Sequence, residues 1–228
     1  MIVFWRLLLA HLLTDFTFQT NGIARWKRES PVGVIVHSGI FLILSFVLCR
    51  QWLGQTWWKV PGWAAIVILF IIHSMEDHYR IWSIGKGGSN DNILFFLWDQ
   101  SIHVILLFLF SQVNNGNIIE EKVIVAICLL IGVTHFTSIL IYYLEEAIYG
   151  HEHVLLRLKG KYYLIVERAA IFGCFLLPGR WWLVFAAVLI LKPLISRVFT
   201  LNDFTRTNLI ISPVSAVAFG LLARFILH

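Results

Sequence analysis

The sequence predicts an all-α fold, a bundle of transmembrane helices that crosses the lipid bilayer several times. Of its 228 residues, 59% are hydrophobic and only 14% are charged, whereas a soluble domain of this size carries about 25% charged residues. Several apolar runs approach or exceed the roughly 18 residues with which a helix crosses a bilayer. The runs are continuous and not alternating, so they favour helices over the strands of a barrel.

Eight membrane segments are expected, because each apolar run is bounded by charged residues or by turn-forming Gly, Asn and Pro. The connections include the basic stretch "ARWKRES", the glycine-rich "GKGGSNDN", and "VNNGN" and "LLPGR" later in the chain. None is long enough to form a soluble core, so a single integral membrane domain, 1–228, is predicted, with halves 1–112 and 113–228. The expected segments are 2–18, 32–50, 61–77, 92–112, 122–145, 161–177, 180–196 and 208–227.

The distribution of Lys and Arg predicts the orientation of the chain in the membrane. One set of connections is rich in basic residues and the opposite set is poor in them. Basic connections stay on the cytoplasmic side, so both termini are expected outside. The net charge of +5 therefore indicates topology and contact with anionic membrane lipid, and no nucleic-acid partner is expected. Tryptophans around 52–63 and at 181–182 are expected to anchor the outer interface.

Three acidic residues in the first half each have a histidine one helical turn away. An i,i+4 spacing places both side chains on one face of a helix. This is the arrangement by which a single helix presents two ligands to one metal ion. Charged groups are costly within lipid, so such pairs usually serve a function. The pairs are His11 with Asp15, His73 with Asp77, and Asp99 with His103.

The predicted topology brings these pairs to a similar depth, in the cytoplasmic leaflet. Asp15 lies near the end of the first segment, Asp77 ends the third, and Asp99 lies in the first half of the fourth. His37, two turns into the second segment, is expected at the same level. Four neighbouring helices could therefore gather the side chains into one pocket. Two amides that could support the ligands or bind a substrate lie nearby, Gln19 and Gln100.

Imidazoles and carboxylates together indicate a divalent metal such as Zn²⁺, Mn²⁺ or Fe²⁺. The three cysteines each fall within an apolar run and show no spacing typical of a thiolate site or a disulfide framework. The carboxylates are predicted to divide between metal coordination and general-base catalysis. The predicted metal ligands are His11, His37, His73 and His103, and the predicted catalytic residues are Asp15, Asp77 and Asp99.

The second half places further charges at the same predicted level. Glu167 and Arg168 lie about two turns into the sixth segment, and Lys192 lies near the cytoplasmic end of the seventh. Cations within a membrane should face the bundle and pair with anions. Arg168 and Lys192 are therefore candidates for binding a phosphate or another anionic head group, although Glu167 and Arg168 could equally be structural.

The motifs resemble those of an uncharacterised family of bacterial integral membrane proteins, a domain of unknown function. The family has a His-Leu-Leu-x-Asp-Phe-x-x-Gln opening, a His-x-x-x-Asp-x-x-Lys motif and an Asp-Gln-x-x-His motif. The second motif departs from the family pattern at its last position, where this chain has Arg80 and the family tends to have Lys. The resemblance extends to Lys27 and, in the second half, to Gly160, Glu167, Arg168, Lys192 and Arg197. The matching first-half residues are His11, Asp15, Phe16, Gln19, His73, Asp77, Asp99, Gln100 and His103.

The resemblance implies a multi-pass protein of the bacterial inner membrane but no established activity. The chain is more distantly similar to membrane-bound metal-dependent hydrolases, which is an analogy of fold and motif only. We therefore expect a metal-dependent intramembrane hydrolase acting on a lipid-like or anionic substrate from the cytoplasmic leaflet. Two alternatives stay open: a transporter or channel for divalent cations or protons, and a non-catalytic assembly subunit whose polar residues only hold helices in register. The oligomeric state is not predicted.

Overall fold

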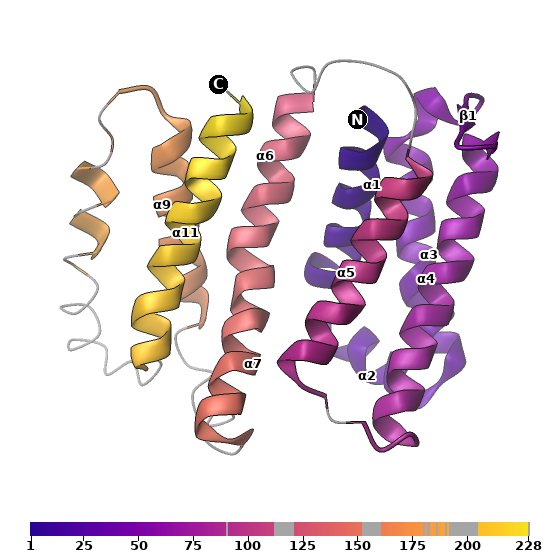
Figure 1. The fold of residues 1–228 in the computed structure, drawn as a ribbon, viewed down its shortest axis with the longest axis horizontal. Coiled ribbons are helices and arrows are strands. Elements are labelled where there is room, and N and C mark those ends of the chain that lie inside the picture. Colours follow the sequence, from indigo (N-terminus) through magenta and orange to yellow (C-terminus); the bar gives the residue numbers. More distant parts are fainter. Residues whose placement is uncertain are drawn as a thin grey trace. The chain divides into compact units, whose positions relative to one another are not determined.

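The protein is all-α apart from one short hairpin, as a computed structural model shows (Figure 1). The structure describes residues 1–89, 91–111, 121–151, 161–179, 181, 183–185, 187–189, 191 and 205–227. The chain forms two compact units, Met1–Ile124 and Val125–His228. The all-α prediction is confirmed for the described residues, which form nine α-helices.

Four helical stretches in the described part of the chain are long and apolar enough to cross a membrane. The eight predicted spans are thus supported only in part, and most of the predicted segment 180–196 lies outside the described residues. The four stretches are Pro31–Leu48, Ile93–Phe110, Lys122–Tyr149 and Ile210–Leu227.

The first unit contains five α-helices, and polar side chains start three of them. Thr20 accepts a hydrogen bond from the backbone N–H of Ile23, Ser30 from that of Val32, and Asn92 from that of Phe95. Such caps satisfy amides that have no partner within the helix. The elements in order are α1 (Ile2–Leu12), the π-helical turn η1 (Leu13–Thr17), α2 (Asn21–Glu29), α3 (Pro31–Leu48), η2 (Arg50–Trp52), β1 (Thr56–Trp57), β2 (Val60–Pro61), α4 (Gly62–Gly85) and α5 (Ile93–Phe110).

Helices α1, α3, α4 and α5 pack around an apolar core. Antiparallel strands β1 and β2 close the end at which α4 begins. Trp57 of this hairpin is fully buried and donates from Nε1 to the carbonyl oxygen of Trp52 at 3.0 Å, so it packs in the core and does not anchor the interface as predicted. Trp58 and Trp63 are exposed and remain candidates for that role. The core residues are Val3, Phe4, Leu7, Ala10, Phe41, Cys49, Trp57, Ala65, Ile66, Leu69 and Leu107.

A partly buried cation links three parts of the first unit near the start of α1. Arg6 donates to the carboxylate of Glu121 at 2.8 Å and to the carbonyl oxygen of Leu48, the last residue of α3, at 2.6 Å. Its guanidinium group also lies over the ring of Trp52, 4.5 Å from the centroid. The bond to Leu48 satisfies one of the carbonyls that a helix leaves open at its C-terminus.

Two elements of the first unit differ from the sequence-based expectation. Helix α4 does not end at Asp77 but continues about two turns further, to Gly85. The polar connection after the first segment contains helix α2, which was expected to be a loop. The sequence of α2 is too polar for a membrane segment, and its basic residues indicate only the side of the membrane on which this connection lies.

The second unit is built around a long helix interrupted by a π-helical turn. Arg168 of α9 is buried and donates to the carbonyl oxygen of Thr134 at 3.0 Å, to Ser138 Oγ, and to Ser212 Oγ at 3.3 Å. The acceptors belong to η4, α7 and α11, so this one side chain links the elements of the unit. The elements are α6 (Lys122–Ile131), η4 (Gly132–Phe136), α7 (Thr137–Tyr149), α9 (Lys161–Leu176) and α11 (Arg206–Leu227).

Candidate functional site

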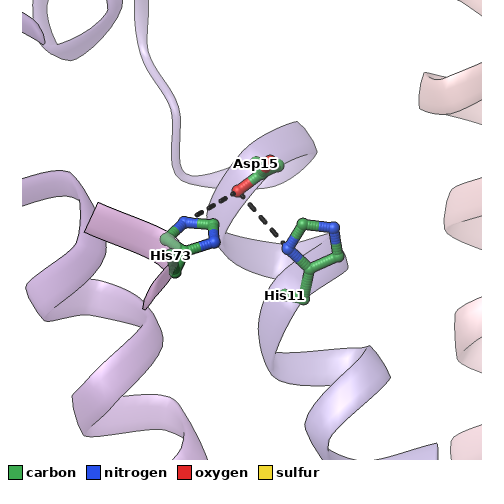
Figure 2. Close-up of side chains that lie close together, drawn as sticks. All are labelled: His11, Asp15 and His73. Atoms are coloured by element: carbon green, nitrogen blue, oxygen red, sulfur yellow. Dashed lines mark ion pairs between the residues drawn. The ribbon is translucent and has the colours of Figure 1, made fainter. Parts of the chain in front are cut away.

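His11, Asp15 and His73 converge in the first unit, as Figure 2 shows. Asp15 Oδ1 lies 3.7 Å from His11 Nδ1 and 3.7 Å from His73 Nε2. The two histidines are almost completely buried, and the side chain of Asp15 is 9% exposed. One ligand atom from each residue can be chosen so that all three lie within 4.8 Å of one another.

A second group of three shares His73 with the first group. His37 Nε2 lies 3.4 Å from Asp77 Oδ2, and His73 Nε2 lies 3.6 Å from the same oxygen. His37 Nε2 also lies 3.3 Å from Asp15 Oδ1, which joins the two groups into one. We call the five residues that make up both groups the His/Asp cluster: His11, Asp15, His37, His73 and Asp77.

The His–Asp distances within each group of three are close to those expected between ligands of one metal ion. Zinc–nitrogen bonds of about 2.0–2.1 Å in a tetrahedron place neighbouring ligand atoms about 3.3–3.4 Å apart. The distances of 3.3–3.7 Å match that edge or exceed it by a few tenths of an ångström, and all of them exceed the roughly 2.7–3.2 Å of an N–H···O hydrogen bond. The inward-facing atoms make no hydrogen bond of normal geometry to the residues that the structure describes: both nitrogens of His11 and of His37, His73 Nε2, Asp15 Oδ1 and Asp77 Oδ2.

Each carboxylate of the cluster uses its two oxygens differently. Asp77 Oδ1 accepts a hydrogen bond from Lys27 Nζ at 2.7 Å, while its Oδ2 faces the histidines. Asp15 Oδ2 accepts from Gln100 Nε2 at 3.4 Å, while its Oδ1 faces the histidines. Donors that bind the outer oxygen orient a carboxylate ligand and leave the inner oxygen available to a cation.

The electrostatics of the cluster also favour a bound cation. Asp77 is buried and the side chain of Asp15 is only 9% exposed, and among the described residues Lys27 is the Lys or Arg that forms an ion pair with either of them, through Asp77. Burying a negative charge without compensation is costly. A divalent ion held by residues of the cluster would provide the missing positive charge.

The cluster lies on the buried stripes of its helices, so the same periodicity that builds the core also builds the site. Residues four positions apart stack on one helical face, and each stripe changes from apolar to polar along its length. The π-helical turn η1 carries Asp15, and π-helical turns are often found at functional sites. The stripes run through Leu7 and His11 on α1, His37 and Phe41 on α3, and Leu69, His73 and Asp77 on α4.

His103 lies beside the cluster but is in neither of the two ligand groups. Its ring packs against the rings of His73 and His11, with centroids 4.5 and 5.0 Å apart. Its Nδ1 lies 2.8 Å from the carbonyl oxygen of Asp99, which can only accept a hydrogen bond, so Nδ1 carries a proton. Its Nε2 lies 3.2 Å from Glu76 Oε2. The two atoms form a close His–carboxylate pair but no hydrogen bond of normal geometry.

Asp99 is held away from the histidines by other donors. Its Oδ2 accepts from Arg80 Nη1 at 3.2 Å and from Gln100 Nε2 at 3.1 Å. Arg80 also bonds Asp91 at 3.0 Å. Asp99 thus supports Gln100, which in turn contacts Asp15, and it is connected to the cluster through that amide.

The structure brings together most of the residues predicted for the site, while their individual roles stay predictions. His11, Asp15, His37, His73 and Asp77 lie together in two groups that share His73. Both predicted amides are connected to the cluster. Gln100 donates to Asp15 directly, and Gln19 accepts at 3.3 Å from Lys27 Nζ, which also binds Asp77. Arg168 belongs to the second unit and is engaged there by its own helices. Lys192 lies outside the described residues.

Two residues of the site were not assigned a role from the sequence. The sequence indicates for Lys27 only a topological role and a place in a family motif, because nothing in the pattern indicates that α2 folds back toward Asp77. Glu76 stands three residues after His73 in "HSMED", a spacing that places both on neighbouring positions of one helix. That spacing could have identified Glu76 as a neighbour of the site.

A family model described as a protein of unknown function, DUF3307, matches residues 3–130. The match covers more than half of the chain and includes every residue of the His/Asp cluster. It ends before the second-half motifs, so the expected resemblance there stays an expectation. Comparison with curated proteins and with solved structures gave no match.

Proposed function

The chain belongs to the DUF3307 family, whose function is unknown, and we propose that it is a metal-dependent hydrolase of the membrane. The observation that carries this proposal is the convergence of three imidazoles and two carboxylates, whose facing nitrogen and oxygen atoms pair at 3.3–3.7 Å. A set of imidazoles and carboxylates without thiolates suits Zn²⁺, Mn²⁺ or Fe²⁺. Such an ion supplies Lewis-acid chemistry for the attack of water on a carbonyl or phosphoryl group.

The residues around the cluster fit the remaining requirements of a hydrolytic site. Hydrolysis needs a group that accepts a proton from water and returns one to the leaving group. Glu76 and His103 lie 3.2 Å apart beside the cluster, and Glu76 is partly exposed, so a proton can reach the pair. Asp15 and Asp77 then serve as ligands, and Asp99 holds Gln100 in place.

The proposed substrate is a lipid-like or anionic molecule that enters from the cytoplasmic leaflet. Four helices of a length and polarity suited to crossing a membrane support an intramembrane location. The basic connections support a cytoplasmic position for the end of the first unit that carries Lys27 and Arg80. Gln19 and Gln100 are the candidate substrate-binding residues beside the cluster, while the substrate-binding role of Arg168 and Lys192 stays a prediction from the sequence.

Elemental analysis of the purified protein tests the proposal first. We expect about one equivalent of Zn, Mn or Fe per chain, and loss of that metal in the double variant Asp15→Asn/Asp77→Asn. Metal-loaded protein should then release a water-soluble or fatty-acid product from bacterial polar lipid extract, and a chelator should stop the release. A protein that neither retains nor rebinds any of these metals would exclude this function.

A divalent-cation or proton transporter would use the same buried His and Asp side chains. The observation that favours it is the continuous polar path from partly exposed Lys27 through Asp77 and the histidines to Asp15. Proteoliposomes containing the metal-loaded protein separate the two functions. A hydrolase releases product without metal or proton flux across the vesicle wall, whereas a transporter shows the flux without product.

A further inference from the structure

Lys27 is the one amine that the described structure places in contact with the His/Asp cluster. Its Nζ lies 2.7 Å from Asp77 Oδ1 and 3.3 Å from Gln19 Oε1. The side chain is only 13% exposed. An ammonium group buried to this extent needs a carboxylate partner, and the short distance is typical of a charge-assisted hydrogen bond. The pair is therefore a fixed part of the site and not a surface contact.

The contact decides which oxygen of Asp77 is available to a metal ion. A carboxylate can bind a metal with one oxygen or with both. The ammonium group binds Oδ1 and turns it away from the histidines, so Oδ2 is the oxygen that faces His37 and His73. Asp15 is restrained less strongly, since its outer oxygen accepts from a neutral amide at 3.4 Å.

The position of Lys27 is set by helix packing. Helix α2 lies directly against α3, where Gly33 has no side chain: a Cβ atom there would come within 2.4 Å of the backbone of Trp26 and 2.6 Å of the backbone nitrogen of Lys27. The Thr20 cap and the bond to Gln19 fix the other end of the connection. The packing of α2 against α3 therefore places the side chain of Lys27 beside Asp77 of α4.

We propose that Lys27 is a positioning residue that holds Asp77 in one-oxygen coordination of a divalent metal ion, an inference that rests on the proposed function. A purely electrostatic effect of Lys27 would change the metal affinity in the opposite direction. An ammonium group near a metal ion repels it, so removing Lys27 would then raise the affinity for metal. A positioning role predicts the opposite sign, because an unrestrained Asp77 either rotates away or binds with both oxygens.

Metal competition and cobalt spectroscopy on the full-length protein in detergent test this inference. Lys27→Met should bind Zn²⁺ about 10–100-fold more weakly than the wild type in competition with a chelator, the range typical for loss of a residue that orients a ligand. With Co²⁺ bound, its visible absorption should weaken or shift as Asp77 changes coordination. Lys27→Arg should restore most of both properties. The control Arg28→Met, from the exposed neighbouring position on α2, should match the wild type.

Equal or tighter Zn²⁺ binding by Lys27→Met, with an unchanged Co²⁺ spectrum, would overturn the inference while leaving the metal centre intact. A wild-type protein that binds neither ion would instead overturn the proposed function itself, so the two failures are distinguishable. If Lys27→Met does not fold, Lys27→Gln keeps a polar group without the charge and is interpreted in the same way.

Discussion

His73 occupies a special position among the ligand side chains, because its Nε2 belongs to both groups of potential metal ligands. This nitrogen lies 3.7 Å from Oδ1 of Asp15, which η1 carries, and 3.6 Å from Oδ2 of Asp77, which α4 carries. His11 and His37 each belong to one group only. A substitution at His73 therefore tests both groups at once.

Replacing His73 with Gln should reduce metal binding more than any other single change in the cluster. Glutamine keeps a polar group of similar size but offers a poor metal ligand, so we expect at least a ~10-fold loss of affinity, the lower end for loss of a residue that only supports a ligand. Inductively coupled plasma mass spectrometry of the purified variant measures the metal per chain. His135→Gln, in the second unit, is the matched control and should retain wild-type metal. Full metal occupancy in His73→Gln would contradict the assignment of this ligand.

Arg6 is the corresponding key residue for stability at the other end of α1. Arg6→Met leaves the carboxylate of Glu121 buried without its cation and one carbonyl of α3 without a donor. Breaking a buried ion pair from one side typically costs about 3–5 kcal/mol, so the free energy of unfolding in mixed micelles should fall by that order. The double variant Arg6→Met/Glu121→Gln should lose less, because no unpaired charge remains. A double variant as unstable as Arg6→Met would show that the charge pair is not the cause.

At the scale of elements, α2 and α3 form the contact that carries Lys27 to the site. The extended residue Ser30 joins the two helices, and Pro31 begins α3 with a fixed backbone angle. Gly33 allows the backbones to approach closely at this corner. The contact therefore links a polar connecting helix to the ligand geometry inside the bundle.

Adding a single methyl group at this contact should affect the site from a distance. Gly33→Ala would place a Cβ 2.4 Å from the backbone of Trp26, so α2 must move and withdraw Lys27 from Asp77. We expect weaker Zn²⁺ binding together with a lower unfolding temperature, both measured on the detergent-purified protein. Gly39→Ala is the control on the same helix, since a Cβ there meets nothing within 4 Å. Metal affinity in Gly33→Ala equal to that in Gly39→Ala would show that the position of α2 does not control the site.

At the scale of the whole molecule, the topology predicted from the sequence gives the first unit an orientation in the bilayer. Helix α4 has 24 residues and, at 1.5 Å per residue, is about 36 Å long. It therefore separates the hairpin at its start from the connection at its end by more than the hydrocarbon thickness of about 30 Å. The excess of basic residues near the end of α4 predicts that this end faces the cytoplasm.

Cysteine labelling of intact cells should reveal this orientation. A membrane-impermeant maleimide should label Lys59→Cys, at the exposed hairpin, in intact cells, and should label Lys86→Cys only after permeabilisation. The three native cysteines are buried, so the wild type serves as the unlabelled control. The reverse pattern would invert the topology and move the site to the outer leaflet.

Much of the fold and of the site followed from local patterns in the sequence. Apolar runs predicted membrane helices, and the i,i+4 spacing of His11 with Asp15 and of His73 with Asp77 placed each pair on one helical face. These features were predictable because helical periodicity acts over a single turn and because lipid penalises unpaired polar groups.

The sequence by itself determined that this protein is a bundle of apolar helices with imidazoles and carboxylates on their inner faces. Only the tertiary structure decided which of those groups meet: His37 joins Asp15 and Asp77, His103 turns to Glu76, and Lys27 reaches Asp77 from 50 residues away. The physical reason is that contacts between helices depend on packing distances and helix rotation, which local spacing does not specify.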